Sequence, residues 1–228
     1  MDTSTPAVTA ALALVDPNAT GGKGVEILAE RRSVDARAHG ELLAPAVAGI
    51  LTETGTSGRD LAAIVAGVGP GPFTGLRVGL VTAAAMGQAL AVPTYGVCSL
   101  DALGQHTAAT ATATATIALV ATDARRKEVY WAVYRDGLRL TEPAVARPDA
   151  VAELLAGAGV EAAMGDGALL YATAWEVPVR DEPRYPPAAA LVALAADRIR
   201  ARAASEALTP LYLRRPDAAE PRPPKPVS

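Results

Sequence analysis

The segment 67–79, GVGPGPFTGLRVG, constrains the fold more than any other part of this sequence. It follows an apolar run, 61–68, that is typical of a short buried strand, and it leads into a helix-like run that ends near Pro93. Glycine at a strand-to-helix turn permits positive φ and lets another backbone or a phosphate approach closely. The segment therefore predicts a tight strand–turn–helix unit.

The glycine segment fits neither of two common phosphate-binding loops. A P-loop requires Lys and then Ser or Thr after its last glycine, whereas Leu76 follows Gly75. A dinucleotide-binding loop requires G-x-G-x-x-G, whereas Pro72 occupies the position of the third glycine. Free N–H groups at a helix N-terminus can still bind an anion. A tight structural turn and a vestigial nucleotide loop therefore both remain open.

Small residues recur every four positions in the helix that follows the turn, and this spacing puts them on one helix face. They are Gly75, Gly79, Ala83 and Gly87. Such a smooth face lets a neighbouring sheet or helix come close. The neighbour is either the chain's own sheet or a helix of another subunit.

Strand-like and helix-like segments alternate in two rounds, which predicts an α/β fold built by duplication. Apolar and alternating runs predict strands at 8–15, 25–32, 61–68, 94–98, 117–122, 128–134, 138–141 and 161–164. Apolar residues at helical spacing predict helices at 35–54, 75–91, from 100, 149–156 and 188–204. The Ala/Thr repeat at 107–116 predicts a mobile loop.

The composition excludes several classes of protein. The chain has 228 residues, 50% of them hydrophobic, which is enough to form two modest lobes. A net charge of −3 argues against strong nucleic-acid binding by this chain alone. The single cysteine, Cys98, cannot form an intrachain disulfide and fits a reducing compartment. With no signal peptide or membrane span in the sequence, we expect a cytoplasmic protein without membrane association.

Few residues suit catalysis or metal binding. The two histidines, His39 and His106, are far apart in sequence, and neither lies in a metal-ligand or nucleophile motif. Asp2, Asp123 and Asp166 follow or end strand-like runs. In an ATPase such aspartates would hold Mg²⁺. The alternative is that they accept hydrogen bonds from backbone N–H groups in turns.

Six segments resemble motifs of the bacterial TsaB family, and they occur in the family's order over nearly the whole chain. They are DTSTPAVTAALAL from Asp2, HGELLAP from His39, GPGPFTGLRVG from Gly69, DARRKEVYWAVY from Asp123, GDGA from Gly165 and PLYLRRPDA from Pro210. TsaB is a subunit of the machinery that makes threonylcarbamoyladenosine in transfer RNA.

The resemblance implies an α/β fold with two lobes, of the actin-like, sugar-kinase and Hsp70 superfamily, in which each lobe is a mixed sheet with flanking helices. We expect a partner-binding N-terminal lobe at 1–98, a C-terminal lobe at 99–213 and a disordered Pro-rich tail at 214–228. The implied role is that of a non-catalytic dimerisation subunit in the complex that adds the threonylcarbamoyl group to the adenosine next to the anticodon. Implied partners are a TsaD-type catalytic paralogue and a TsaE-like ATPase, with transfer RNA reached only through the complex and a homodimer formed when the chain is alone.

The resemblance and the small-residue stripe together give two sets of site residues. The expected partner interface comprises His39, Leu42, Leu43, Gly75, Gly79, Ala83 and Gly87. The candidate vestigial nucleotide contacts are Asp2, Thr3, Gly69, Gly71, Thr74 and Asp123. Gly79→Leu is expected to break the complex and leave the monomer folded. We expect no catalytic residue, no metal site and no tightly bound cofactor, while weak binding of ATP, ADP or Mg²⁺ stays open, with the partners as the expected holders.

The alternative function is a small actin-like ATPase or kinase that uses Asp2, Asp123 and the glycine turn, and micromolar binding of Mg·ATP would favour it.

The start of the chain departs from the family pattern. In the family a strand precedes the motif that begins here at Asp2, whereas Met1 stands directly before it. Either the chain starts upstream of Met1 or the sheet lacks one edge, and we favour an upstream start.

Overall fold

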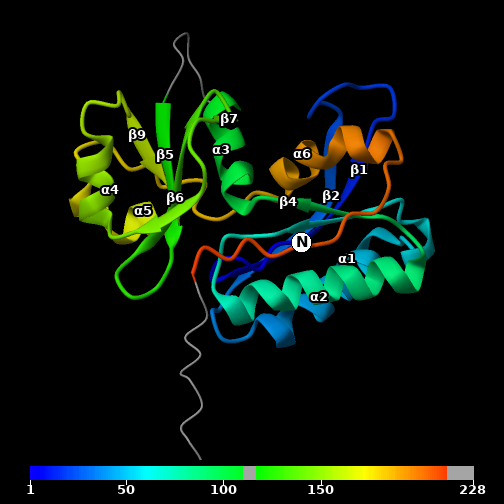
Figure 1. Cartoon of the computed structure of the whole chain (residues 1–228). Coiled ribbons are helices and arrows are strands. Elements are labelled where there is room, and N and C mark those ends of the chain that lie inside the picture. Colours follow the sequence, from blue (N-terminus) through cyan, green and yellow to red (C-terminus); the bar gives the residue numbers. More distant parts are fainter. Residues whose placement is uncertain (110–116, 215–228) are drawn as a thin grey trace, which may run out of the picture.

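The chain forms two lobes, seen on the right and left of Figure 1, each with strands flanked by helices. The structure is a computed structural model, and it describes residues 1–109 and 117–214. The expected loop at 107–116 therefore lies mostly outside the described residues, and so does all but the first residue of the expected tail.

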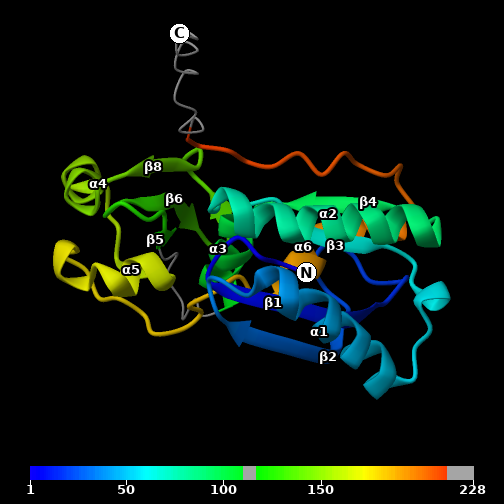
Figure 2. The ribbon, with the colours of Figure 1, turned by 90° about the horizontal axis from the view of Figure 1, so that it is seen from below.

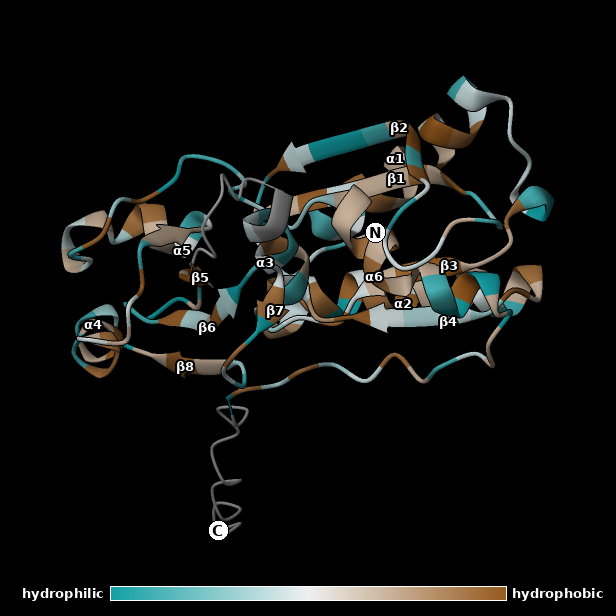
Figure 3. Ribbon diagram, turned by 90° about the horizontal axis from the view of Figure 1, so that it is seen from above, coloured by the Kyte–Doolittle hydropathy of each residue, from teal (hydrophilic) through white to brown (hydrophobic). Residues whose placement is uncertain are grey.

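The first lobe contains four strands in two separate two-stranded sheets. The strands are β1 (Ala7–Val15), β2 (Val25–Val34), β3 (Ile64–Gly67) and β4 (Thr94–Val97). β1 and β2 pair antiparallel, and β3 and β4 pair parallel. The outer strand β2 carries charged side chains and is conspicuously hydrophilic in Figure 3, and charge on an edge strand discourages pairing with other chains.

Helices cover both faces of these strands. They are α1 (His39–Thr54), α2 (Phe73–Leu90) and α6 (Ala188–Arg200), with a short 3₁₀ helix at Gly58–Asp60. α1 packs on β1 and β2, and α2 packs on β3 and β4. α6 contacts all four strands from the opposite side, as Figure 1 shows.

The second lobe is built on a five-stranded sheet. Its strands are β5 (Ile117–Asp123), β6 (Val129–Arg135), β7 (Leu138–Arg139), β8 (Ala144–Ala146) and β9 (Ala162–Met164). The order is β7-β6-β5-β9, and β8 also pairs with β6. Its helices are α3 (Ser99–Ala109), α4 (Pro148–Leu155) and α5 (Asp166–Leu170), with a 3₁₀ turn at Ala172–Ala174.

The central strand of the second lobe is buried on both faces. Leu119 and Ala121 of β5 join a cluster with Trp131 and Trp175, while Ala118 and Val120 face α3 on the other side. A strand covered on both faces needs an almost unbroken apolar run, and residues 117–121, IALVA, supply it.

Helix α6 packs on the first lobe, although the expected division assigned residues 99–213 to the second. Its inward side chains, Leu191 and Ala195, share a cluster with Val65 and Tyr95 of β3 and β4. The physical reason is that two strand pairs already covered by α1 and α2 still have an apolar face to bury. The first lobe is therefore assembled from both ends of the sequence.

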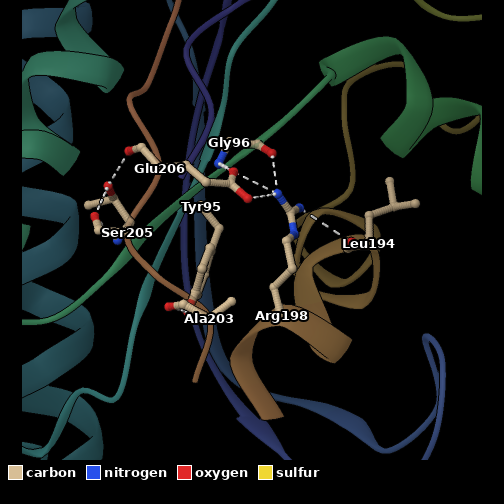
Figure 4. Close-up of polar contacts among 8 residues, drawn as sticks. Tyr95, Gly96, Leu194, Arg198, Ala203, Ser205 and Glu206 are labelled. Atoms are coloured by element: carbon tan, nitrogen blue, oxygen red, sulfur yellow. Dashed lines mark hydrogen bonds and ion pairs between the residues drawn. The ribbon is translucent and has the colours of Figure 1, made fainter. Parts of the chain in front are cut away.

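The chain then runs back along β4 as an extended segment, residues 201–214, which we call the strap (Figure 2). The backbone N–H of Glu206 donates to Thr94 O at 2.9 Å, and that of Leu211 donates to Val68 O at 2.8 Å. Figure 4 shows the anchor of the strap, where Arg198 of α6 holds the Glu206 carboxylate at 2.7 Å. The strap thus covers the outer edge of β4.

Most predicted elements are confirmed, with shifts at their ends. The helix expected at 35–54 begins at His39, because the Asp35 carboxylate accepts the N–H of Arg37 and forms a turn instead. The strand expected at 138–141 is reduced to Leu138–Arg139. Among the described residues, no helix combines the length and the apolar character that crossing a membrane requires.

Candidate functional site

The carboxylate of Asp2 is buried and joins three segments that are distant in sequence. One oxygen accepts the N–H and the hydroxyl of Ser4, at 2.9 and 2.8 Å. The other accepts the hydroxyl of Ser99, at 2.6 Å, and the Ser99 oxygen in turn accepts the N–H of Gly69 at 3.2 Å. Both Asp2 oxygens therefore have partners within the chain, as the interpretation of Asp2 as a turn residue predicted.

The glycine turn packs directly on the hairpin that follows Asp2. A Cβ at Gly67 would overlap the Asp2 carboxylate, and one at Gly71 would overlap the backbone of Ser4. Gly69 has φ +93°, which L side chains rarely adopt. These glycines are explained by contact with the chain's own backbone, and the space that a phosphate would need beside Gly71 is filled by Ser4.

The second lobe places two aspartates together. The backbone N–H of Asp123 donates to Asp166 at 3.3 Å, and the Asp123 carboxylate accepts the N–H of Arg125 at 2.9 Å. Burial, together with the negative charge of Asp123, raises the pKa of the Asp166 carboxyl to about 6. Within the described part of the chain, no three His, Cys, Asp or Glu side chains gather closely enough to hold a metal ion.

The candidate nucleotide contacts are thus only partly brought together. Asp2, Thr3, Gly69 and Gly71 form one buried cluster between the hairpin and the turn. Thr74 is exposed in the first turn of α2. Asp123 belongs to the second lobe, where it contacts Asp166 and Arg125.

The small-residue stripe of α2 faces the interior, which corrects its expected role as a partner surface. A Cβ at Gly79 would lie 2.5 Å from Thr3 Oγ1, and one at Gly87 would lie 2.5 Å from Thr94 Cγ2. Ala83 is fully buried, and a Cβ at Gly75 would lie 3.1 Å from Thr3 O. The structure places the chain's own residues against the stripe, namely Thr3 before β1 and Thr94 of β4, and not another subunit.

The α1 residues of the expected interface are also mostly internal. His39 is 7% exposed, with Nε2 2.8 Å from Thr5 O, and Leu43 is 1% exposed. Leu42 is half-buried against the same cluster as Leu43. The expected residues thus position the two helices from inside and do not form their outer surface.

Part of the surface that α1 and α2 expose is apolar, and we call this part the outer helical face; Glu41 and Glu53 of α1 are exposed beside it. Its exposed apolar residues are Ala44, Pro45, Ala48, Phe73, Val81, Ala84, Ala85 and Ala89. Val81 is 66% exposed and Phe73 44%. Arg77 is the only charged residue of α2, and its guanidinium lies over the Phe73 ring at 3.7 Å. Sequence reasoning missed this face because the glycine stripe, the stronger pattern, lies on the opposite side of α2.

The end of the strap closes the same face at the lobe boundary. The Phe73 ring stacks on Tyr212 at 5.2 Å, and Arg77 Nε donates to the Tyr212 hydroxyl at 2.9 Å. Arg214 then donates to Ala124 O at 2.7 Å in the second lobe. These contacts therefore link the strap to α2 in the first lobe and to the turn between β5 and β6 in the second lobe.

Comparison with known proteins gives consistent matches. The family model of TsaD, tRNA N6-adenosine threonylcarbamoyltransferase, matches residues 26–177. An uncharacterized protein of Mycobacterium tuberculosis is 46% identical over 220 residues, covering 96% of this chain and 92% of the relative. The tRNA threonylcarbamoyladenosine biosynthesis protein TsaB of Escherichia coli is 41% identical over 99 residues, covering 43% of this chain and 42% of that protein.

A solved structure extends the match to the whole fold. A Pseudomonas aeruginosa protein described as similar to the peptidase YeaZ superposes with a TM-score of 0.73 at 30% identity, covering 93% of this chain and 97% of that one. The two-lobed α/β fold expected from the sequence motifs is confirmed. On these matches, the chain belongs to the TsaB family, within the wider group that the TsaD model describes.

Proposed function

We propose that this chain is a non-catalytic subunit of the machinery that places the threonylcarbamoyl group on transfer RNA, and that it binds a TsaD-type catalytic paralogue. Family membership supports a part in tRNA threonylcarbamoyladenosine biosynthesis, the process named for the E. coli relative. The observation that carries the binding role is the outer helical face, where Val81 and Phe73 are exposed among small apolar residues.

An exposed helical face of this kind has a preferred partner. Contiguous exposed apolar surface marks an interaction site, and small side chains on α1 and α2 let another helix pair approach closely. A paralogue with the same two helices offers a matching surface. Because an apolar face can pack against a second copy of itself about a two-fold axis, we propose that it forms a homodimer when the paralogue is absent.

The non-catalytic part of the proposal is supported by the buried cluster around Asp2. Asp2 is engaged by Ser4 and Ser99, and Ser4 fills the space beside the glycine turn. We therefore propose that nucleotide and metal are held by the partners, a TsaD-type subunit and a TsaE-like ATPase, in the cytoplasm. With a net charge of −3, this chain contacts transfer RNA only as part of the complex. No observation favours the ATPase or kinase alternative over this role.

A matched pair of surface variants tests the role. Val81→Glu puts a charge on the outer helical face, where Val81 is 66% exposed, while Leu154→Glu puts the same charge on α4, where Leu154 is 68% exposed. We expect V81E to lose co-elution with the TsaD-type protein and threonylcarbamoyl transfer to transfer RNA, and L154E to keep both. Equal circular dichroism and melting temperature would establish that both variants fold.

Two results would contradict the proposal. Full transfer activity of the reconstituted pathway without this chain would remove the subunit role. An intact, active complex with V81E would leave the subunit role standing and remove the outer helical face as its interface.

A further inference from the structure

Arg77 lies within the apolar stripe that α2 exposes on the outer helical face. It follows Phe73 by one helical turn and precedes Val81 by one turn, so the three side chains share one side of the helix. All three are exposed. A partner that covers Phe73 and Val81 must therefore cover Arg77 as well.

Two aromatic side chains hold the guanidinium of Arg77. Its Cζ lies 3.7 Å from the centre of the Phe73 ring, so this ring covers one face of the planar group. Its Nε donates to the Tyr212 hydroxyl at 2.9 Å, and the Tyr212 ring stacks on Phe73 at 5.2 Å. The side chain has therefore lost part of its rotamer freedom before any partner binds, which lowers the entropy cost of binding.

The fold supplies no counter-ion for Arg77. An arginine that holds two parts of this chain together pairs with a carboxylate, as Arg198 does with Glu206 at 2.7 Å. Within residues 1–109 and 117–214, Arg77 forms no ion pair, and its one hydrogen bond is that from Nε to Tyr212. The terminal nitrogens, which carry the paired donors of the guanidinium fork, receive no acceptor from those residues.

Burying this charge without a counter-ion would oppose binding. Taking an ion out of water costs more free energy than one cation–π contact returns, so the Phe73 ring cannot compensate for the burial of Arg77 by itself. A stable complex that covers the outer helical face therefore needs an anionic group opposite Arg77.

The surroundings of Arg77 favour a carboxylate over a phosphate as that group. Surfaces that bind a nucleic-acid backbone gather several basic residues, whereas Arg77 is the only charged residue of α2 and lies between apolar Phe73 and Val81. A planar guanidinium donates two parallel hydrogen bonds to a carboxylate. Because a partner helix uses its backbone carbonyls in its own hydrogen bonds, the acceptor on such a helix must be a side chain, Asp or Glu.

We propose that Arg77 is the charged anchor of the outer helical face and receives an Asp or Glu side chain of the TsaD-type paralogue. Tyr212 is a positioning residue, because it acts on the partner through the guanidinium that it holds. The inference rests on the proposed binding role of this face and adds the chemistry that specifies the partner. That partner presents a helical surface with a carboxylate among small apolar side chains.

A matched pair of variants tests the anchor. Arg77→Met removes the charge and keeps an unbranched apolar side chain, and Arg147→Met makes the same change at the exposed residue before α4. We expect Arg77→Met to raise the Kd for the purified TsaD-type protein at least about 30-fold, since one member of a buried charge pair is lost. Arg147→Met should leave the Kd unchanged. Equal Kd values for the two variants would overturn the inference.

A charge reversal identifies the carboxylate. Arg77→Glu should abolish co-elution with the TsaD-type protein, because two carboxylates would then face each other. Acidic residues on the surface helices of that protein are replaced by Arg one at a time, and one such replacement should restore co-elution with Arg77→Glu. Rescue at no position would overturn the assignment of a carboxylate as the ligand.

Tyr212→Phe tests the positioning role, because it removes the hydroxyl that accepts Arg77 Nε and keeps an aromatic ring to stack on Phe73. It should raise the Kd about fivefold in the original chain, the effect of losing one hydrogen bond. In the Arg77→Met background it should have no effect. The same rise in both backgrounds would contradict a role that acts through Arg77.

Val81→Glu separates this inference from the proposed function. If Val81→Glu abolishes binding while Arg77→Met leaves it unchanged, the outer helical face stands as the interface and the inference fails. If neither variant changes binding, both fail. If Arg77→Met leaves the complex intact but weakens its binding of transfer RNA, Arg77 contacts an RNA phosphate, and the carboxylate ligand is refuted.

Discussion

Gly79→Ala tests whether the glycine stripe of α2 serves the protein's own packing. The hydroxyl of Thr3 donates to Gly75 O at 2.8 Å and accepts the N–H of Gly79 at 3.0 Å, both in a buried setting. A Cβ at Gly79 would lie 2.5 Å from that hydroxyl oxygen, which is too close for the arrangement to persist. The new methyl group must therefore displace Thr3.

The expected size of the effect follows from these contacts. Losing two buried hydrogen bonds costs about 2–3 kcal/mol, while alanine in place of glycine within a helix returns about 1 kcal/mol. The net loss of about 1–2 kcal/mol in the free energy of unfolding should lower the melting temperature by roughly 3–6 °C. The sequence alone predicts that the Gly79→Leu monomer stays folded. The contacts of Gly79 change that expectation, and Gly79→Leu should destabilise the chain more than Gly79→Ala does.

Gly40→Ala is the matched control, because Gly40 lies in α1 and an added Cβ would meet nothing within 4 Å. It should leave the melting temperature unchanged or raise it slightly. Urea denaturation and differential scanning calorimetry measure both variants. In a Thr3→Ala background the cost of Gly79→Ala should disappear. A Gly79→Ala chain as stable as the Gly40→Ala chain would refute the reasoning.

Two other predictions concern titrating groups. The pKa of Asp166 is raised to about 6 in the folded chain, so its contribution to stability is present at low pH and is lost as pH rises from about 4 to 6. The stability of Asp166→Asn relative to the original chain should accordingly increase by about 2 kcal/mol between pH 4 and pH 7.5 in urea titrations, and a constant difference would contradict the raised pKa. Burial also raises the pKa of the Cys98 thiol to about 11. Iodoacetamide at pH 7.5 should therefore alkylate Cys98 in the native chain at least about 100-fold more slowly than Cys98 in the urea-unfolded chain. Comparable rates would show that the thiol is accessible.

Local patterns predicted β5, β6, α4 and β9 of the second lobe, whereas β8 and α5 were not predicted. The apolar run in β5 and the Asp136–Gly137 turn between β6 and β7 each contain the information for their own geometry. The first lobe depends on a helix about 90 residues beyond its last strand. No pattern within 188–204 indicates that α6 packs on β1 to β4. The expected boundary therefore could not assign α6 to the first lobe.

The sequence predicted a close-packed face of α2, but not which neighbour that face meets. The four-residue spacing of Gly75, Gly79 and Gly87 correctly indicates one close-packed face of α2. Spacing alone does not say whether that face meets the chain's own strands or another molecule, since both need small residues. The exposed face around Val81 consists of residues that are ordinary in any helix, so only the fold identifies it.

The return of α6 to the first lobe also sets the order in which the chain can mature during synthesis. All strands and helices of the second lobe lie between residues 99 and 179, so that lobe can close while the last part of the chain is still in the ribosome. β1 to β4 are made first, yet one of their apolar faces stays uncovered until Ala188–Arg200 has emerged. The earliest-made half of the protein is thus the last to finish folding, and it is the half that a nascent-chain chaperone would need to protect.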